Sequence, residues 1–433
     1  MTAGTLDVEG AIARASAEIG DSAILDALRL LASRASPPGG ERPLALAVAE
    51  WGRRALADAT WEVEAVDDES ASVFARSAVG THAPELAFYG HLDTSLTGSA
   101  DRDVGVTGVL TAPPPLAVDG RTVRGFGVGV AKAPSAAGIV AFAAASRALR
   151  AQAVPHRLTL LLAAGGTHRA APAEGTARFG RGVEHALARG WRPDAVLNVK
   201  AGPRGVLHEE PAAAYLRVRV RARWDAALAR RVAAPDGGLA RHAGTVLDAI
   251  ESWRAGYLAA HPAHGQLAPE IAIGAIRSGL PDKPDLLPGL LEIFVYAMLL
   301  PHEDPARVAR ELAAFLASRV TKLPRRPSVE VDVYAFAPGG AAPASAEIVC
   351  IAAAAWARAF GETAPVRGWT GATDGAILLA RGIPTARMGP RVTRDERDPR
   401  IEQVSLDELT SAARAYAETA IRYCASRGTG SAA

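Results

Sequence analysis

The hydrophobic pattern predicts strands and helices that alternate along the first half of the chain. Residues 86–89 form an apolar and aromatic run that stops at Gly90, as a buried strand does. Residues 158–163 and 195–199 repeat this pattern, and the segments around them carry apolar residues at helical spacing. This order predicts an α/β fold, a mostly parallel mixed sheet with helices on both faces.

The pattern changes after Pro203. Residues 215–222 alternate polar and apolar side chains, as a half-exposed antiparallel strand does, and further strands and helices follow up to about residue 318. A basic linker at 321–327 leads into a strand at 328–334, with which we expect the α/β pattern to resume. The sequence thus predicts a discontinuous α/β domain, residues 1–204 and 326–433, interrupted by an α+β lid domain, residues 205–325.

Composition narrows the class of protein. A chain of 433 residues with 49% apolar and 22% charged residues is typical of a soluble two-domain protein. The net charge of +2, with both signs interspersed, argues against a nucleic-acid or membrane partner. Cys350 and Cys424 are the only cysteines, which excludes a disulfide framework. Residues 1–10 lack a signal-peptide pattern, so we expect a cytoplasmic protein.

Candidate chemistry begins where the strand at 86–89 ends. His91 and Asp93 stand two residues apart, so they point the same way on an extended backbone. A carboxylate in that position can fix the tautomer of an imidazole, as a metal-binding histidine requires. Ligands of open α/β sheets bind at the carboxyl ends of the strands.

Four motifs in order along the chain resemble the di-zinc amidohydrolases, the family of aminoacylase, acetylornithine deacetylase, succinyl-diaminopimelate desuccinylase and glutamate carboxypeptidase. They are Tyr89-Gly-His-Leu-Asp93, the run 119–127, the run 273–279 with Pro288, and the run 371–385 with Met388-Gly-Pro390. The resemblance implies hydrolysis of an amide or peptide C–N bond by two zinc ions, and a homodimer formed through the lid domain.

Carried over residue by residue, the resemblance makes His91 the first metal ligand and Asp93 its orienting carboxylate. The remaining ligand and base positions hold Val130, Gly165 and Gly166, and Lys200, and Asp398 is the nearest match to the last ligand. A zinc site needs about three or four protein ligands, so we expect the inherited site to be lost. Our hypothesis is that Lys200 replaces the cation and pairs with Asp398 or Asp93.

Four further positions have competing interpretations. Lys132 borders the expected cleft, and we favour an ordinary lysine at a helix start. Asp374 is expected to cap the helix that follows it, at the cleft. His168 could replace the lost glutamate as base or ligand, although a loop histidine is more often only solvated. His208-Glu-Glu210 is expected at the surface of the lid.

Two functions remain open. The first is a hydrolase of C–N bonds that uses zinc or another divalent metal in an altered site around His91, Asp93, His168 and Asp398. The second is a non-catalytic homologue that keeps the cleft for a small-molecule or peptide-like ligand, or serves as a structural subunit. The ligand positions favour the second function, and the resemblance favours the first.

Overall fold

The computed structural model describes residues 7–80, 83–172, 175–226 and 238–428. In these residues the large sheet has nine strands: β1 (Thr60–Ala65), β2 (Ala71–Val79), β3 (Glu85–His91), β6 (His156–Ala163), β8 (Ala195–Val199), β9 (Val206–Glu210), β16 (Gly340–Ala341), β17 (Val366–Gly368) and β18 (Thr385–Met388). Their order is β1-β2-β6-β3-β8-β18-β9-β16, with β17 beside β9. Because β6, β3, β8 and β18 are parallel, their carboxyl ends meet at one edge.

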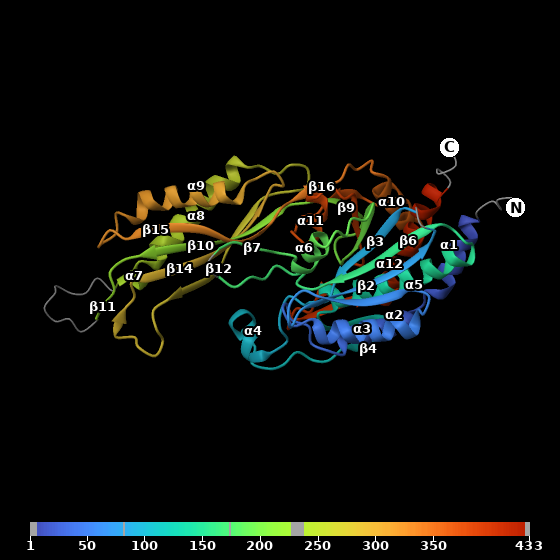
Figure 1. The fold of residues 1–433 in the computed structure, drawn as a ribbon. Helices are drawn as coiled ribbons and strands as arrows, with labels where there is room; N and C mark the ends of the chain where they lie inside the picture. Colours follow the sequence, from blue (N-terminus) through green and yellow to red (C-terminus); the bar gives the residue numbers. More distant parts are fainter. Residues whose placement is uncertain (1–6, 81–82, 173–174, 227–237, 429–433) are drawn as a thin grey trace.

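Helices cover both faces of the large sheet, which confirms the predicted fold class (Figure 1). One face packs against α1 (Val8–Glu18), α2 (Asp21–Ala32), α3 (Arg42–Ala55), α5 (Ala133–Ala151), α10 (Glu347–Phe360) and α12 (Leu406–Gly428). The other face packs against α6 (Arg181–Ala188) and α11 (Gly375–Ala380). Strand β3 shows the alternation, since Leu86 and Phe88 join the first core and Ala87 and Tyr89 the second.

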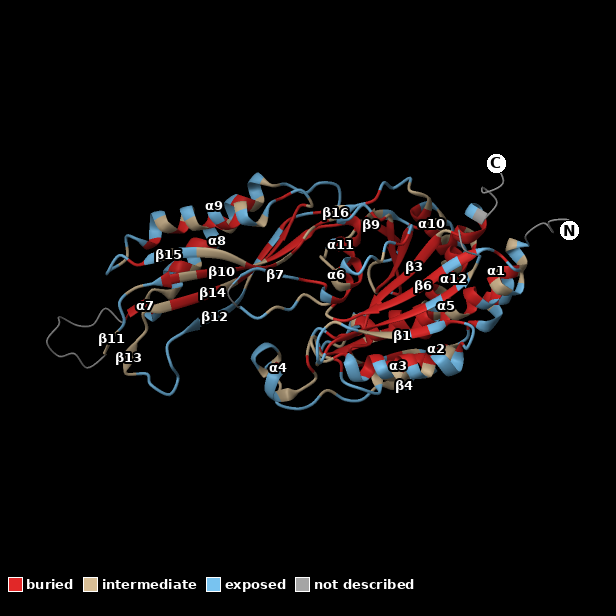
Figure 2. Ribbon diagram, viewed as in Figure 1, coloured by how far each residue is buried: buried red, intermediate tan, exposed pale blue. Residues whose placement is uncertain are grey.

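Helix α5 and the residues before it form a long, largely apolar helix. The segment Val128–Ala151 is long and apolar enough to cross a bilayer by length and composition. However, 89% of its most hydrophobic window is buried inside the protein, and Figure 2 shows it against the sheet. Its composition therefore fits the central helix of a packed core.

A smaller five-stranded sheet forms the lid domain within the described residues. It contains β12 (Glu270–Ser278), β14 (Leu290–Leu299), β10 (Ala212–Arg221), β15 (Ser328–Ala337) and β7 (Ala177–Arg178), in that order. The helices α8 (Ala243–Ala260) and α9 (Pro305–Val320) pack on its apolar face. Short elements α7 (Gly238–Arg241), β11 (Asp225–Ala226) and β13 (Leu286–Leu287) lie at its far end (Figure 1).

Strand pairing places both boundaries between the domains at other residues than the sequence predicts. Strand β15 pairs with β10 of the lid, so the α/β pattern does not resume at 326 as we expected. Strand β9 pairs with β16, β17 and β18 of the large sheet, so residues 206–210 do not open the lid. The lid sheet therefore spans β10 to β15, and the connections near Pro211 and Pro338 join it to the rest.

A four-stranded sheet lies beside the carboxyl edge of the large sheet. It consists of β4 (Ala117–Asp119), β5 (Thr122–Phe126), β19 (Thr393–Arg394) and β20 (Ile401–Ser405), in the order β19-β20-β5-β4. A tight turn at Asp119-Gly120 joins β4 to β5. From β5 the chain enters the irregular segment η1 (Val128–Lys132) and then α5. A helix that we did not expect, α4 (Ala100–Thr107), interrupts the loop at 94–115.

Candidate functional site

A cleft of ≈ 640 Å³ lies where the parallel strands end. Its walls come from the end of β3, the loops after β6, β8 and β18, the segment η1, and strand β20. The ionisable side chains in its lining are His91, His168, Lys200, Arg387, Arg391, Arg394 and Glu402. This is the location at which an open α/β sheet binds its ligands.

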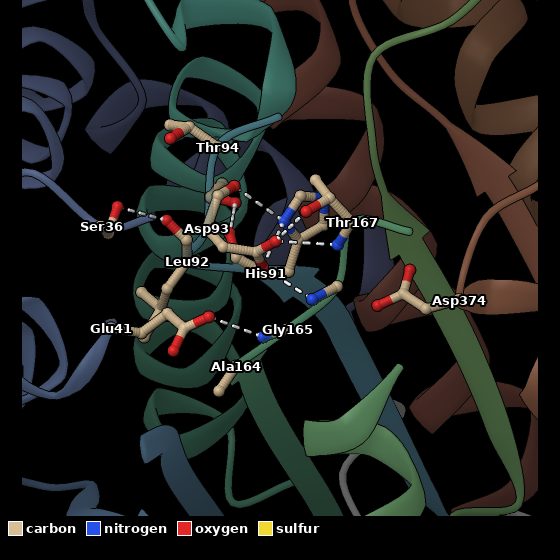
Figure 3. A network of polar contacts seen from close by, with 12 residues as sticks. Ser36, Glu41, His91, Leu92, Asp93, Thr94, Ala164, Gly165, Thr167 and Asp374 are labelled. Atoms are coloured by element: carbon tan, nitrogen blue, oxygen red, sulfur yellow. Dashed lines mark hydrogen bonds and ion pairs between the residues drawn. The ribbon is translucent and has the colours of Figure 1, made fainter. Parts of the chain in front are cut away.

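His91 and Asp93 form the pair that their spacing predicts (Figure 3). The Nδ1 atom of His91 lies 3.1 Å from Oδ1 of Asp93 and 3.0 Å from the Asp93 carbonyl oxygen. Both side chains are buried. Because Nδ1 is held by these oxygens, Nε2 is the nitrogen that remains for a ligand in the cleft.

The loop after β6 closes over this pair. The backbone N–H groups of Gly166 and Thr167 donate to the Asp93 carboxylate at 2.7 and 2.8 Å, and the Thr167 hydroxyl donates as well. Burial alone would raise the pKa of Asp93, but His91 and these hydrogen bonds lower it to about 2. Asp93 therefore serves two functions, since it orients His91 and also anchors the loop.

The loop leaves no space for a side chain at Gly166. A Cβ atom there would lie 2.4 Å from Cβ and Cγ of His91 and 2.8 Å from Oδ2 of Asp374. Glu41 fixes the loop from below, because its Oε1 accepts the Gly165 N–H at 2.9 Å. Burial, and then the charge of Asp93, raise the pKa of Glu41. We did not single out Glu41 from the sequence.

Lys200 pairs with Asp374. The expectation that Lys200 pairs with Asp398 or Asp93 was therefore wrong, and so was the expectation that Asp374 caps the helix after it. The Nζ atom of Lys200 donates to Asp374 Oδ1, and neither Asp93 nor Asp398 lies within ion-pair distance of that nitrogen. Asp374 precedes α11 but makes no side-chain capping bond, because its other oxygen accepts from the Tyr89 hydroxyl. Burial and Asp374 raise the pKa of Tyr89 well above its usual value. All three side chains are buried.

A second buried ion pair lies beside the first. Arg387 on β18 lies 3.6 Å from Oε1 of Glu210, and the Thr373 hydroxyl donates to Oε2 at 2.6 Å. The guanidinium stacks over the Trp369 ring, with 4.1 Å to its centroid. Glu210 is 2% exposed, so the expectation of a surface position was wrong. The sequence does contain one sign of this buried ion pair, because Arg387 is a charged residue inside a short apolar strand.

Val130 faces the cleft from the segment η1. The backbone N–H groups of Gly129 and Val130 donate to Oε2 of Glu402 at 2.8 and 3.1 Å. Glu402 thus holds the segment through its backbone, and the side chain at position 130 is apolar.

Two of the predicted site residues lie elsewhere. Asp398 forms a bidentate pair with Arg400, at 2.9 and 2.7 Å, and does not line the cleft with His91. Lys132 is buried, and its Nζ donates to the carbonyl oxygens of Leu31 and Arg34 and to the Ser36 hydroxyl. Lys132 thus satisfies carbonyl groups at the end of α2, where a cation is favourable, and it does not border the cleft.

His168 lies in the cleft wall and is not simply solvated. Its ring stacks on Phe179 with 4.4 Å between centroids, and the buried Nε2 has no hydrogen-bond partner in the part of the chain described. Burial lowers its pKa to about 4, so the ring is neutral at physiological pH. A neutral imidazole with a free nitrogen can accept or donate one hydrogen bond to a ligand.

Comparison with known proteins shows to which family this chain belongs. The family model described as "Peptidase family M20/M25/M40" matches residues 87–422, which is most of the chain. The chain belongs to this family. No curated protein sequence matches it.

Solved structures of peptidases share this fold over nearly the whole chain. The dipeptidase Dug1p of Saccharomyces cerevisiae has a TM-score of 0.69 at 11% identity, covering 98% of this chain and 99% of that chain. Human carnosine dipeptidase 1 has a TM-score of 0.68 at 14% identity, covering 96% and 99%. The YXEP protein of Bacillus subtilis, a dinuclear metal-binding peptidase from the M20 family, has 0.56 at 14%, covering 94% and 98%.

The residues of this M20 member do not fit a dinuclear metal centre. Among the described residues, no group of three or more His, Cys, Asp or Glu side chains is arranged to hold a metal ion. His91 is the one inherited ligand that faces the cleft, and Lys200 brings a positive charge to it. Repulsion between an ammonium group and a dication about 4 Å apart amounts to several kcal/mol even when it is well screened.

Proposed function

We propose that this chain is a non-catalytic member of the M20 family that keeps the cleft as a binding site. The observation that carries the proposal is the pairing of Lys200 with Asp374 at a position where the family resemblance implies a metal-ligating carboxylate. In this buried ion pair the charge of the carboxylate is already neutralised by the lysine. A dication beside the pair would have to displace the lysine.

The remaining positions support the same proposal. Val130 offers no oxygen to bridge two metals, and no side chain fits at Gly166 beside His91. The resemblance implies a general base in the same loop, where Gly165 stands. His168 is a weak base, because burial lowers its pKa to about 4. Neither activation of a water molecule by a metal nor its deprotonation by a strong base is therefore available from these residues.

Metal content and hydrolysis test the proposal together. The purified chain would be incubated with zinc, manganese or cobalt, desalted, and measured by elemental mass spectrometry. The same samples would be assayed with dipeptides and N-acetyl-amino acids. We expect far less than one ion per chain and no turnover above a chelator-treated control. One or two ions per chain, lost in a His91→Ala variant and accompanied by chelator-sensitive hydrolysis, would establish the altered-site hydrolase instead.

We also propose that the lid forms a homodimer, through the edge strand β12. Among the described residues this strand pairs on one side only, with β14, so its other edge is open to pairing with another chain. Its surface carries an apolar side chain, Ile276, which is 51% exposed, and Leu280 beyond it is 58% exposed. An exposed edge that carries apolar residues is a common site of association between chains.

A further inference from the structure

The cleft continues into an apolar annex. A second cavity of ≈ 330 Å³ shares Ser95, Val130, Arg394 and Glu402 with the cleft. Its apolar walls come from the loop after β3, the end of α4 and strand β5: Leu96, Val106, Val109 and Phe126. The ion pair of Asp398 and Arg400 closes another side. Val130 lies on the boundary between the two cavities, so the apolar surface runs from one into the other.

The acidic groups around the cleft are already occupied. Asp93 accepts from the loop after β6, and Asp374 accepts from Lys200 and Tyr89. Glu210 is held by Thr373 and Arg387, and Glu402 by two backbone N–H groups. None of these carboxylates is left without a donor, so none of them requires a cation from the cleft.

The basic groups are less fully used. Arg391 and Arg394 are exposed at the cleft, and their side chains form no ion pair within the described ranges. Arg387 is 4% exposed, and its Nε has no hydrogen-bond partner among the described residues. A buried donor without a partner destabilises the protein, and a hydrogen bond to a ligand oxygen would remove that penalty. The cleft therefore presents free donors and positive charge beside an apolar annex.

We propose that the cleft and its annex bind a small carboxylate that carries an apolar chain, without a metal ion. The carboxylate lies at Arg387, Arg391 and Arg394, where charge-assisted hydrogen bonds are strong. The chain passes Val130 into the annex, where its burial is favourable. The inference deepens the proposed function and rests on it, because a dinuclear metal centre would occupy the same part of the cleft.

Titration calorimetry with simple amphiphiles tests this on the full chain after treatment with a chelator. Hexanoate, octanoate and octanamide are the probes. We expect octanoate to bind more tightly than hexanoate, by up to about 16-fold, since each buried methylene contributes at most roughly fourfold. Octanamide, which has the same chain but no charge, should bind at least about tenfold more weakly than octanoate. Equal binding of octanoate and octanamide would overturn the assignment of the head group.

Three variants separate the two parts of the site. Arg391→Gln combined with Arg394→Gln should weaken octanoate binding at least about tenfold and leave octanamide unchanged. Val109→Asp in the annex should abolish the preference for octanoate over hexanoate. Arg14→Gln, at an exposed arginine on α1, removes one positive charge far from the cleft, half of what the double variant removes, and should change neither affinity. If Arg14→Gln weakens octanoate binding as much as the double variant does, the effect is one of net charge, and the site is refuted.

The outcomes for this inference and for the proposed function are distinct. If the protein binds no metal and no carboxylate, only the ligand assignment fails. If octanoate binds only after zinc is added and is released by the chelator, the carboxylate is a ligand of a metal centre. Both proposals then fail.

Discussion

Replacing Gly166 with alanine tests how tightly the loop after β6 closes over His91. The new Cβ would lie 2.4 Å from two atoms of the His91 side chain, so either the histidine or the loop must move. Overpacking of this kind costs about 1–3 kcal/mol. A displaced loop would also lose the N–H donors of Gly166 and Thr167 to the buried carboxylate of Asp93, at roughly 1.5–3 kcal/mol for each bond to a charged group.

With partial relaxation we expect Gly166→Ala to lower the free energy of unfolding by about 3–5 kcal/mol. Urea denaturation followed by circular dichroism would show this as a midpoint lowered by roughly 1–1.7 M for a slope near 3 kcal/mol/M. Gly256→Ala is the matched control, because Gly256 lies inside α8 with no atom within 4 Å of the new Cβ. That control should be neutral or stabilising by about 0.5–1 kcal/mol.

The same substitution bears on the proposed loss of the metal site. If the loop is packed as described, Gly166→Glu cannot restore a ligand beside His91, even together with Val130→Asp and Lys200→Glu. A Gly166→Ala variant as stable as the wild type, within about 0.5 kcal/mol, would refute the steric reasoning. The absence of a carboxylate at position 166 would then be a simple substitution in an open site.

Three further predictions concern separate parts of the molecule. Lys200→Met should destabilise the protein by about 3–5 kcal/mol, because it leaves the buried Asp374 carboxylate without its cation. The double variant Lys200→Met with Asp374→Asn should recover most of that loss in the same urea assay. His168 has a folded-state pKa of about 4, below the 6.5 of an unfolded histidine, so the unfolded chain binds more protons between these values and stability falls as the pH falls from 6.5 to 4. His168→Phe should keep the ring packing and remove up to about 3 kcal/mol of that pH dependence, as thermal unfolding at pH 7 and pH 4.5 would show. Ile276→Lys should convert a dimer to a monomer in light scattering after gel filtration, whereas Val106→Lys, at an 80% exposed residue of α4, should leave the dimer intact.

Local patterns in the sequence predict much of the fold, and they fail where distant segments meet. The pair of His91 and Asp93 follows from spacing alone, and the structure contains it. The partner of Lys200 could not be read in this way, since Asp374 is brought to it only by the packing of α11 against the sheet. Asp398 pairs instead with Arg400, two residues away, and the order of the motifs along the chain does not reveal that local pair.

The misplaced domain boundary has a physical reason as well. Residues 328–333 alternate apolar and polar side chains as residues 215–222 do, which is typical of a half-exposed antiparallel strand. That signal was present, but the basic linker before it was read as the end of the lid. Pairing between strands is a long-range property, so composition at a linker does not decide which sheet the next strand joins.

The lid enters and leaves the molecule at one place. Ala213 near the start of β10 is paired with Ala337 at the end of β15, so the two ends of the inserted chain lie one ladder rung apart, about 5 Å. A short turn could therefore replace residues 212–337 and keep the strand pairs of the large sheet, although the core on its second face would lose the side chains that the lid contributes. The excised segment could be closed or produced as a separate polypeptide. The buried Tyr334 and Ala335 would need polar replacements in the separated lid, because they now pack against the rest of the protein. Because the two ends of the lid lie side by side, this position is suitable for inserting another domain in place of the lid.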